Sequence, residues 1–91
     1  MIVAVEGIDG AGKNTLVTAV QQRSGADTLA FPRYADSVHA QLAHDALHGR
    51  MGDLTDSAFG MATLFALDRH GAKTLLDGFA AAPDRVIILD R

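Results

Sequence analysis

The 91 residues predict an α/β fold built on a parallel sheet. Three apolar stretches of strand type alternate with stretches of helical periodicity, and this alternation is typical of parallel sheets. A glycine cluster separates the first predicted strand from the first predicted helix, and a carboxylate ends the third strand. Because a helix should follow each strand, we expect an incomplete domain whose sheet stops after its third strand.

The first strand is expected at 2–6, an apolar run that suits a buried parallel strand. A helix follows at about 13–24, and Gly25 lies just past its end, where small residues close helices. The apolar side chains with helical spacing in it are Leu16, Val17 and Val20. The second strand is expected at 28–31.

A second helix is predicted to begin after a capping side chain, which is either Asp36 or Ser37. Its expected apolar side consists of Val38, Leu42, Ala46 and Leu47. A single longer helix is expected from about 55 to 79, in a stretch rich in Ala, Leu and Met. The third strand is expected at 85–90, where four apolar residues precede a carboxylate.

Composition narrows the class of protein. Cysteine is absent, which excludes a disulfide framework and thiolate metal sites. The net charge of −3 argues against a broad surface for nucleic acid or membrane. No apolar run approaches the roughly 20 residues that span a bilayer, and no basic leader opens the chain, so we expect a cytoplasmic protein.

The glycine cluster matches the phosphate loop of nucleotide-binding proteins. It follows a predicted strand and opens a predicted helix, which is the context that this motif requires. Its phosphate-binding positions are Gly7, Gly10, Ala11, Gly12, Lys13, Asn14 and Thr15. Asn14 departs from the strict pattern, which has Ser or Thr after the lysine as an Mg²⁺ ligand. The alternative is a structural glycine turn with a chance lysine.

Four segments, in this order, resemble the thymidylate kinase family and its actinobacterial type: Glu6-Gly-Ile-Asp-Gly-Ala-Gly-Lys13, Phe31-Pro-Arg-Tyr34, Ala62-Thr-Leu-Phe-Ala-Leu-Asp-Arg69 and Ile87-Ile-Leu-Asp-Arg91. The resemblance implies a three-layer α/β/α fold of the P-loop NTPase type, with residues 1–91 as the N-terminal portion of a nucleoside-monophosphate kinase domain. It implies transfer of the γ-phosphoryl group of ATP to dTMP, with Mg²⁺, giving dTDP and ADP for dTTP biosynthesis. Full-length relatives commonly form homodimers.

The resemblance also implies roles in phosphoryl transfer. Lys13 would hold the transferred group, and Arg91 would contact the acceptor phosphate. Asp9 would meet the sugar 3′-hydroxyl and lie near the metal, and Asp90 would lie near Mg²⁺, with water between the ion and each carboxylate. The structural alternatives are that Asp9 only stabilises the loop or caps the following helix, and that Asp90 is a helix cap or loop residue.

The same resemblance implies a pocket for the acceptor nucleotide. Arg33 would grip its phosphate, with Phe31 and Pro32 shaping the wall. Phe65 would stack on thymine and Arg69 would hydrogen-bond its edge, and their spacing of four puts both on one helical face. The alternatives are a packed turn with a solvated Arg33, a core position for Phe65 and a surface ion pair for Arg69.

Two rival functions remain open at this stage. One is a different P-loop kinase acting on another nucleotide or nucleoside. The other is a truncated, non-catalytic nucleotide-binding remnant, which Asn14 and the abrupt end favour. Some relatives carry a catalytic arginine in the phosphate loop, where this chain has Gly10 and Ala11, so the cation would come from a lid. We therefore expect negligible turnover from these 91 residues alone.

Overall fold

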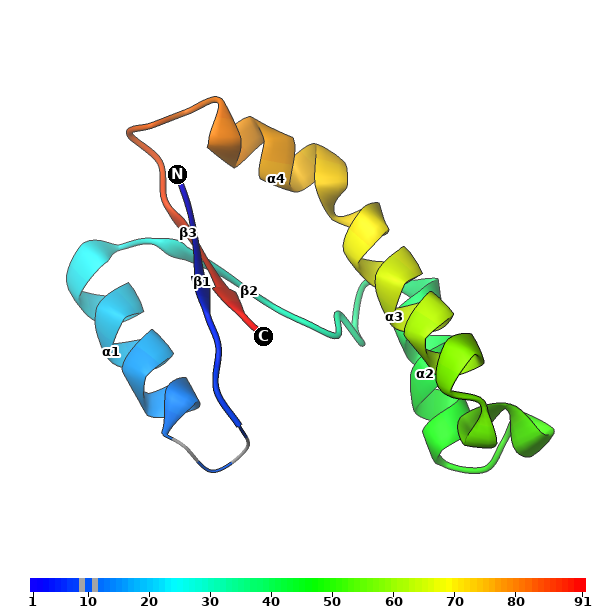
Figure 1. Cartoon of the computed structure of the whole chain (residues 1–91). Coiled ribbons are helices and arrows are strands. Elements are labelled where there is room, and N and C mark those ends of the chain that lie inside the picture. The colour runs from blue at the N-terminus through cyan, green and yellow to red at the C-terminus, as the bar shows by residue number, and fades with distance from the viewer. Residues whose placement is uncertain (9, 11) are drawn as a thin grey trace. The chain divides into compact units, whose positions relative to one another are not determined.

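The computed structural model describes residues 1–8, 10 and 12–91 (Figure 1). The chain forms two compact units: 1–31 with 74–91, and 32–73. The first unit contains the sheet and the phosphate-loop segment. The second is helical. Each is described by itself.

The sheet of the first unit has three parallel strands. Their bounds are Ile2–Val5 for β1, Asp27–Ala30 for β2 and Ile87–Asp90 for β3. The order is β1-β3-β2, so that the last strand in sequence lies at the centre. Val5 and Ala30 are both the register partners of Asp90, so the three strands end at the same level. The predicted parallel α/β sheet is confirmed.

One face of the sheet is covered by α1, Lys13–Ser24, which has the predicted bounds. Val17 is the helix residue buried against this face, where it packs in a cluster with Ile88 of β3. The predicted apolar stripe is wrong in part, because Leu16 and Val20 are exposed. A four-residue strand is too short to cover a wide helical face, so only the residue that points directly at it is buried.

The other face is covered by α4, Lys73–Ala80 (Figure 1). Phe79 of this helix packs with Ile87 and Leu89 in a second cluster. Successive side chains of a strand point to opposite faces, so β3 alternates between the two clusters. Burial of each large apolar side chain stabilises by about 1.5–3 kcal/mol. The sheet unit is therefore a small three-layer α/β/α arrangement, as predicted.

β1 lies at an edge of the described sheet, and its side chains are more exposed than the buried strand that its composition predicts. Ile2 is 38% exposed and Val3 is 40% exposed. Among the described strands, β1 pairs with β3 alone. Its apolar composition suits a strand covered on both sides, and the 91 residues supply a neighbour on only one side.

In the second unit, α2 spans Val38–Leu47 and begins at the cap Ser37. The Ser37 hydroxyl accepts a hydrogen bond from the Ala40 N–H at 3.1 Å, which decides between the two capping residues considered above. The buried residues of α2 are Ala40, Ala43 and Ala46. The predicted apolar side is therefore wrong in part, because Val38 and Leu47 are exposed.

The expected single helix over 55–79 is wrong. The structure has a 3₁₀ turn, η1, at Gly52–Asp56, then α3 at Ala58–Gly71, then α4. Ser57 separates η1 from α3, because its backbone is extended, with φ −95° and ψ 107°. Its side chain caps α3. At the second boundary the Ala72 N–H donates to the carbonyls of Arg69 and His70, a tighter pattern than an α-helix. None of the helices in the described ranges has the length and apolar character to cross a bilayer.

Candidate functional site

Two glycines between β1 and α1 have the backbone conformation that a tight loop requires. Gly10 and Gly12 have φ of 83° and 81°, a left-handed conformation that residues with a side chain adopt at a cost. Gly12 precedes the first residue of α1, and no side chain in the described part of the chain caps this helix start. The first amide groups of α1 are thus available to an anion. Asp9 and Ala11, two predicted site residues, lie outside the described residues.

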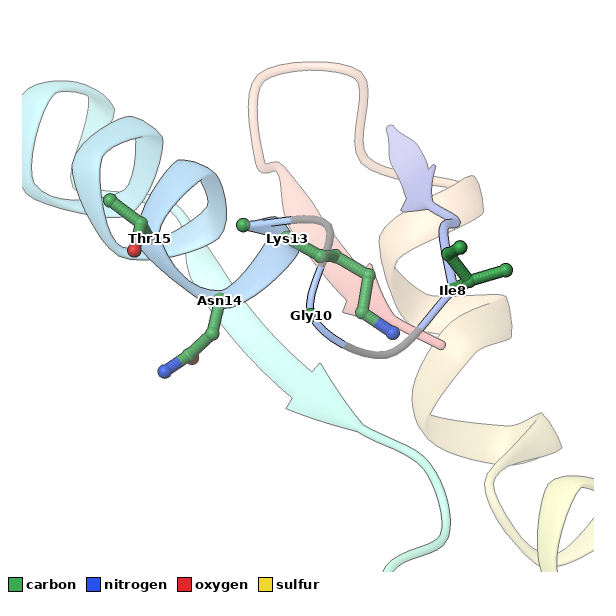
Figure 2. A pocket seen from close by; sticks show the side chains of 6 residues that line it. Ile8, Gly10, Lys13, Asn14 and Thr15 are labelled. Atoms are coloured by element: carbon green, nitrogen blue, oxygen red, sulfur yellow. The ribbon is translucent and has the colours of Figure 1, made fainter.

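A pocket of about 410 Å³ opens at this loop, lined by Ile8, Gly10, Gly12, Lys13, Asn14 and Thr15. Figure 2 shows the Lys13 side chain reaching from the start of α1 toward the Ile8 side of the pocket. The side chains of Asn14 and Thr15 project from other sides of the helix. An ammonium group beside the uncapped start of a helix is chemically suited to phosphate oxygens.

Lys13 is held by the end of β3. Its Nζ lies 3.2 Å from Oδ1 of Asp90, and the two side chains are 19% and 23% exposed. Lys13 Nζ also donates to the main-chain oxygen of Arg91, and the Arg91 guanidinium pairs with the Glu6 carboxylate. These groups come together because Val5 and Asp90 are register partners. Asp90 thus lies at the carboxyl edge of the sheet, where α/β proteins bind ligands.

In the second unit, Arg33 and Asp68 form a buried ion pair. The Asp68 carboxylate accepts from the Arg33 main-chain N–H at 3.0 Å and from its Nε at 2.8 Å. Arg33 Nη2 donates to the main-chain oxygen of Asp68 at 2.5 Å. The Arg33 side chain is 14% exposed and Asp68 is 1% exposed. The alternative of a solvated Arg33 is therefore wrong.

Asp68 was not singled out from the sequence. The sequence feature that could have pointed to Asp68 is its place in the Ala-Leu-Asp-Arg run. It lies three residues after Phe65 and therefore near Phe65 on the same helical face. A carboxylate at a buried position of a helix requires a partner. Spacing alone could not show that the partner would be Arg33, which is 35 residues away.

The remaining predicted acceptor-pocket residues are distributed over both units. Phe65 is half-buried and Arg69 is exposed on α3. Pro32 is half-buried at the start of the same unit. Phe31 belongs to the sheet unit, where it packs against the cluster of Phe79. The pocket that these residues were predicted to form stays a prediction.

The parallel sheet, its two helical layers and the glycine segment before α1 are consistent with an α/β protein of the P-loop class. No protein-family model matches the chain. Over its whole length the chain is 52% identical, across 99 aligned positions, to thymidylate kinase of Mycobacterium tuberculosis, in strains CDC 1551 / Oshkosh and H37Rv. The predicted resemblance to thymidylate kinases is thus confirmed over the whole of this chain.

The chain spans 44% of the length of these relatives. The alignment has 99 positions against the 91 residues of this chain, so some positions of the relatives have no counterpart here.

Proposed function

We propose that the protein containing these residues is a thymidylate kinase, which transfers the γ-phosphoryl group of ATP to dTMP and gives ADP and dTDP. The observation that carries this proposal is the whole-chain identity of 52% to thymidylate kinase. The lysine at the glycine-lined pocket supports it, since Lys13 lies beside Asp90 at the carboxyl edge of a parallel sheet. The reaction would supply dTTP biosynthesis.

Phosphoryl transfer asks a protein mainly for positioning and for charge neutralisation. Lys13 would exchange its contact with Asp90 for the phosphate oxygens of ATP, while the amides at the start of α1 hold the same phosphates. Arg91, which pairs with Glu6, is the second cation near this edge, and we assign it to the acceptor phosphate. We assign Asp9, from the sequence alone, to the sugar 3′-hydroxyl of dTMP and to the surroundings of the metal.

The oxygen ligands near the loop fit Mg²⁺. Asp90 offers a carboxylate beside Lys13, and Asn14 offers an amide oxygen at the rim of the pocket. Mg²⁺ in such sites keeps several waters and takes one or two carboxylates together with phosphate oxygens. Asp90, with Asp9, would hold the ion through water, and the bound ion would neutralise charge on the phosphates of ATP.

For the acceptor nucleotide, we assign thymine stacking to Phe65 and edge recognition to Arg69, with Arg33, Phe31 and Pro32 at the phosphate side. Stacking of a base on an aromatic ring is worth about 1–3 kcal/mol. One methyl group distinguishes dTMP from dUMP, and a methyl in an apolar pocket contributes only about 1–3 kcal/mol. We therefore expect dUMP to be a poorer substrate, with kcat/KM reduced about 10- to 200-fold. Equal kcat/KM for the two nucleotides would contradict this assignment.

The proposed function is tested by ADP release from the full-length protein with ATP, Mg²⁺ and a panel of nucleoside monophosphates. We expect dTMP to be the preferred acceptor. Lys13→Met should lower kcat by about 10²–10³, the loss found when one donor to a developing charge is removed. Lys73→Met is the matched control, because it removes the same charge outside the loop, and its activity should equal wild type. A preference for another monophosphate would refute the proposal.

A second candidate function, nucleotide binding without turnover, is favoured by Asn14, which replaces the usual hydroxyl ligand of Mg²⁺. It predicts that ATP binds to the full-length protein while ADP release stays at background. Homodimer formation by the full-length protein and its cytoplasmic location stay predictions from the sequence and the resemblance.

A further inference from the structure

We infer that Asp68 is a positioning residue for the acceptor-nucleotide pocket, acting through Arg33. It fixes Arg33, whose carbonyl closes the turn at 34–36, against α3, the helix that carries Phe65 and Arg69. This inference rests on the proposed function, because it assumes that these residues receive the acceptor nucleotide. It adds to that function a residue that touches neither nucleotide.

The first argument is the number of bonds between the two residues. Asp68 holds Arg33 at three donors, one on the main chain and two on the guanidinium. A bond to the main-chain N–H positions the turn, and bonds to Nε and Nη2 orient the plane of the guanidinium. One residue of α3 therefore sets both the backbone and the side-chain direction of Arg33.

The second argument is burial. Asp68 is 1% exposed and Arg33 is the only described ion-pair partner of its carboxylate. An ion pair in such a place is a poor source of stability, because desolvation offsets most of the attraction. It does however impose one arrangement, since a buried charge without its partner is strongly unfavourable. The pair is therefore better suited to setting geometry than to holding the fold.

The third argument concerns the part of the Arg33 guanidinium that is not bonded to Asp68. Asp68 occupies the edge formed by Nε and Nη2. In the part of the chain that the structure describes, Nη1 takes part in no hydrogen bond or ion pair. A guanidinium held on one edge by a carboxylate can bind phosphate with its other donors. Asp68 would thus orient these donors without competing for them.

Gly71 makes room for this arrangement. A Cβ atom at position 71 would lie 2.7 Å from Nη2 of Arg33. Such a contact is too short, so the end of the Arg33 guanidinium must shift from its present position. Gly71→Ala therefore disturbs the orientation of Arg33 while both charges stay in place.

The test is steady-state kinetics of the full-length protein, with the KM for dTMP and the KM for ATP measured separately. Asp68→Asn should raise the KM for dTMP and lower kcat/KM for dTMP by about 100-fold, as for a misplaced binding group. The KM for ATP should stay within about twofold of wild type, because Asp68 acts on the acceptor pocket alone. A mere loss of folded protein would lower kcat and leave both KM values unchanged, so the two KM values distinguish these outcomes. Asp45→Asn is the matched control: its carboxylate pairs with Arg50 at 3.1 Å on the surface of the same unit, and its kinetics should equal wild type.

A double-mutant cycle shows whether Asp68 acts through Arg33. Once Arg33→Met is present, adding Asp68→Asn should change kcat/KM for dTMP little further. Effects that multiply would overturn the inference, and so would an unchanged KM for dTMP in folded Asp68→Asn.

If Asp68→Asn does not fold, the KM for dTMP of Gly71→Ala tests the positioning role instead, with Gly78→Ala as its control. A raised KM for dTMP in Gly71→Ala alone supports the positioning role, and wild-type values overturn it. A wild-type protein that releases no ADP with dTMP refutes the proposed function itself. An active wild type with unaffected variants refutes only the role of Asp68.

Discussion

At the scale of single residues, the described site groups are held by neighbours that are distant in sequence. Lys13 is held by Asp90 in the sheet unit, and Arg33 is held by Asp68 in the helical unit. In both pairs a cation proposed to meet phosphate has a carboxylate on one side. Such partners keep the long side chains of lysine and arginine in place before the ligand arrives, which lowers the entropy lost on binding.

Gly71 gives a stability prediction at this scale. Alanine in a helix is favoured over glycine by about 0.8–1 kcal/mol. At Gly71 this gain is opposed by the loss of a charge-assisted bond between Arg33 and Asp68, worth about 1.5–3 kcal/mol. We expect Gly71→Ala to lower the free energy of unfolding by about 1 kcal/mol.

The control is Gly78 in α4, where a Cβ atom would meet nothing within 4 Å. Gly78→Ala should raise the free energy of unfolding by up to about 1 kcal/mol. Urea denaturation of both variants measures the difference. Equal stabilisation by the two substitutions would show that the guanidinium of Arg33 is free to move aside.

At the scale of elements, helix boundaries follow local capping chemistry more closely than apolar periodicity. Ser37 begins α2 and Ser57 begins α3, each by accepting a hydrogen bond from the N–H three residues later. The boundary at Ser57 shortens the long helix that composition favoured, because a residue in extended conformation cannot continue a helix. Ala-rich stretches are good helix formers, but they do not show where a helix begins.

The cap of α2 gives the second prediction. Ser37→Ala should lower the free energy of unfolding by about 1 kcal/mol, because the Ala40 N–H loses its acceptor. Asp36→Ala is the matched control, since its side chain does not cap the helix, and it should change stability by less than about 0.5 kcal/mol. The measurement is the urea midpoint at constant m value. A larger effect at Asp36 would assign the cap to that residue.

At the scale of the whole molecule, the sheet unit exposes an edge. β1 is an apolar strand with one described neighbour, and exposed strand edges promote association between chains. The 91-residue chain should therefore self-associate as its concentration rises, a behaviour that light scattering over a concentration series would show.

A charge on this edge should reduce the association. Val3→Lys places a lysine on β1, and lysine at strand edges opposes pairing. Val20→Lys is the matched control, because Val20 is equally exposed but lies on α1, at 42% against 40% for Val3. If both variants reduce association equally, net charge and not the strand edge is responsible.

The molecule also gives a prediction about activity. The chain spans 44% of the length of its relatives. The proposed reaction needs a further cation, and an arginine in that role raises the rate by about 10³–10⁵. We expect the 91 residues alone to release ADP at background rate with dTMP, whereas the full-length protein turns over. Robust release by the 91-residue chain would contradict the assignment of that cation to a lid.

Local signals in the sequence were enough to predict the three strands in their order along the chain, the glycine segment before α1, the bounds of α1 and the capping of α2 to within one residue. They were enough because a glycine turn, a helix cap and an apolar run act over a few neighbouring positions. The relation to thymidylate kinase was also recognisable, because its motifs are short contiguous segments.

Long-range packing determined the rest. The central place of β3, the exposure of Leu16 and Val20, and the pairing of Arg33 with Asp68 all depend on residues that are distant along the chain. Periodicity shows that a side of a helix is apolar, but not how much of it a short sheet covers. In the same way, a buried carboxylate reveals that it needs a partner, and only the folded chain shows which cation reaches it.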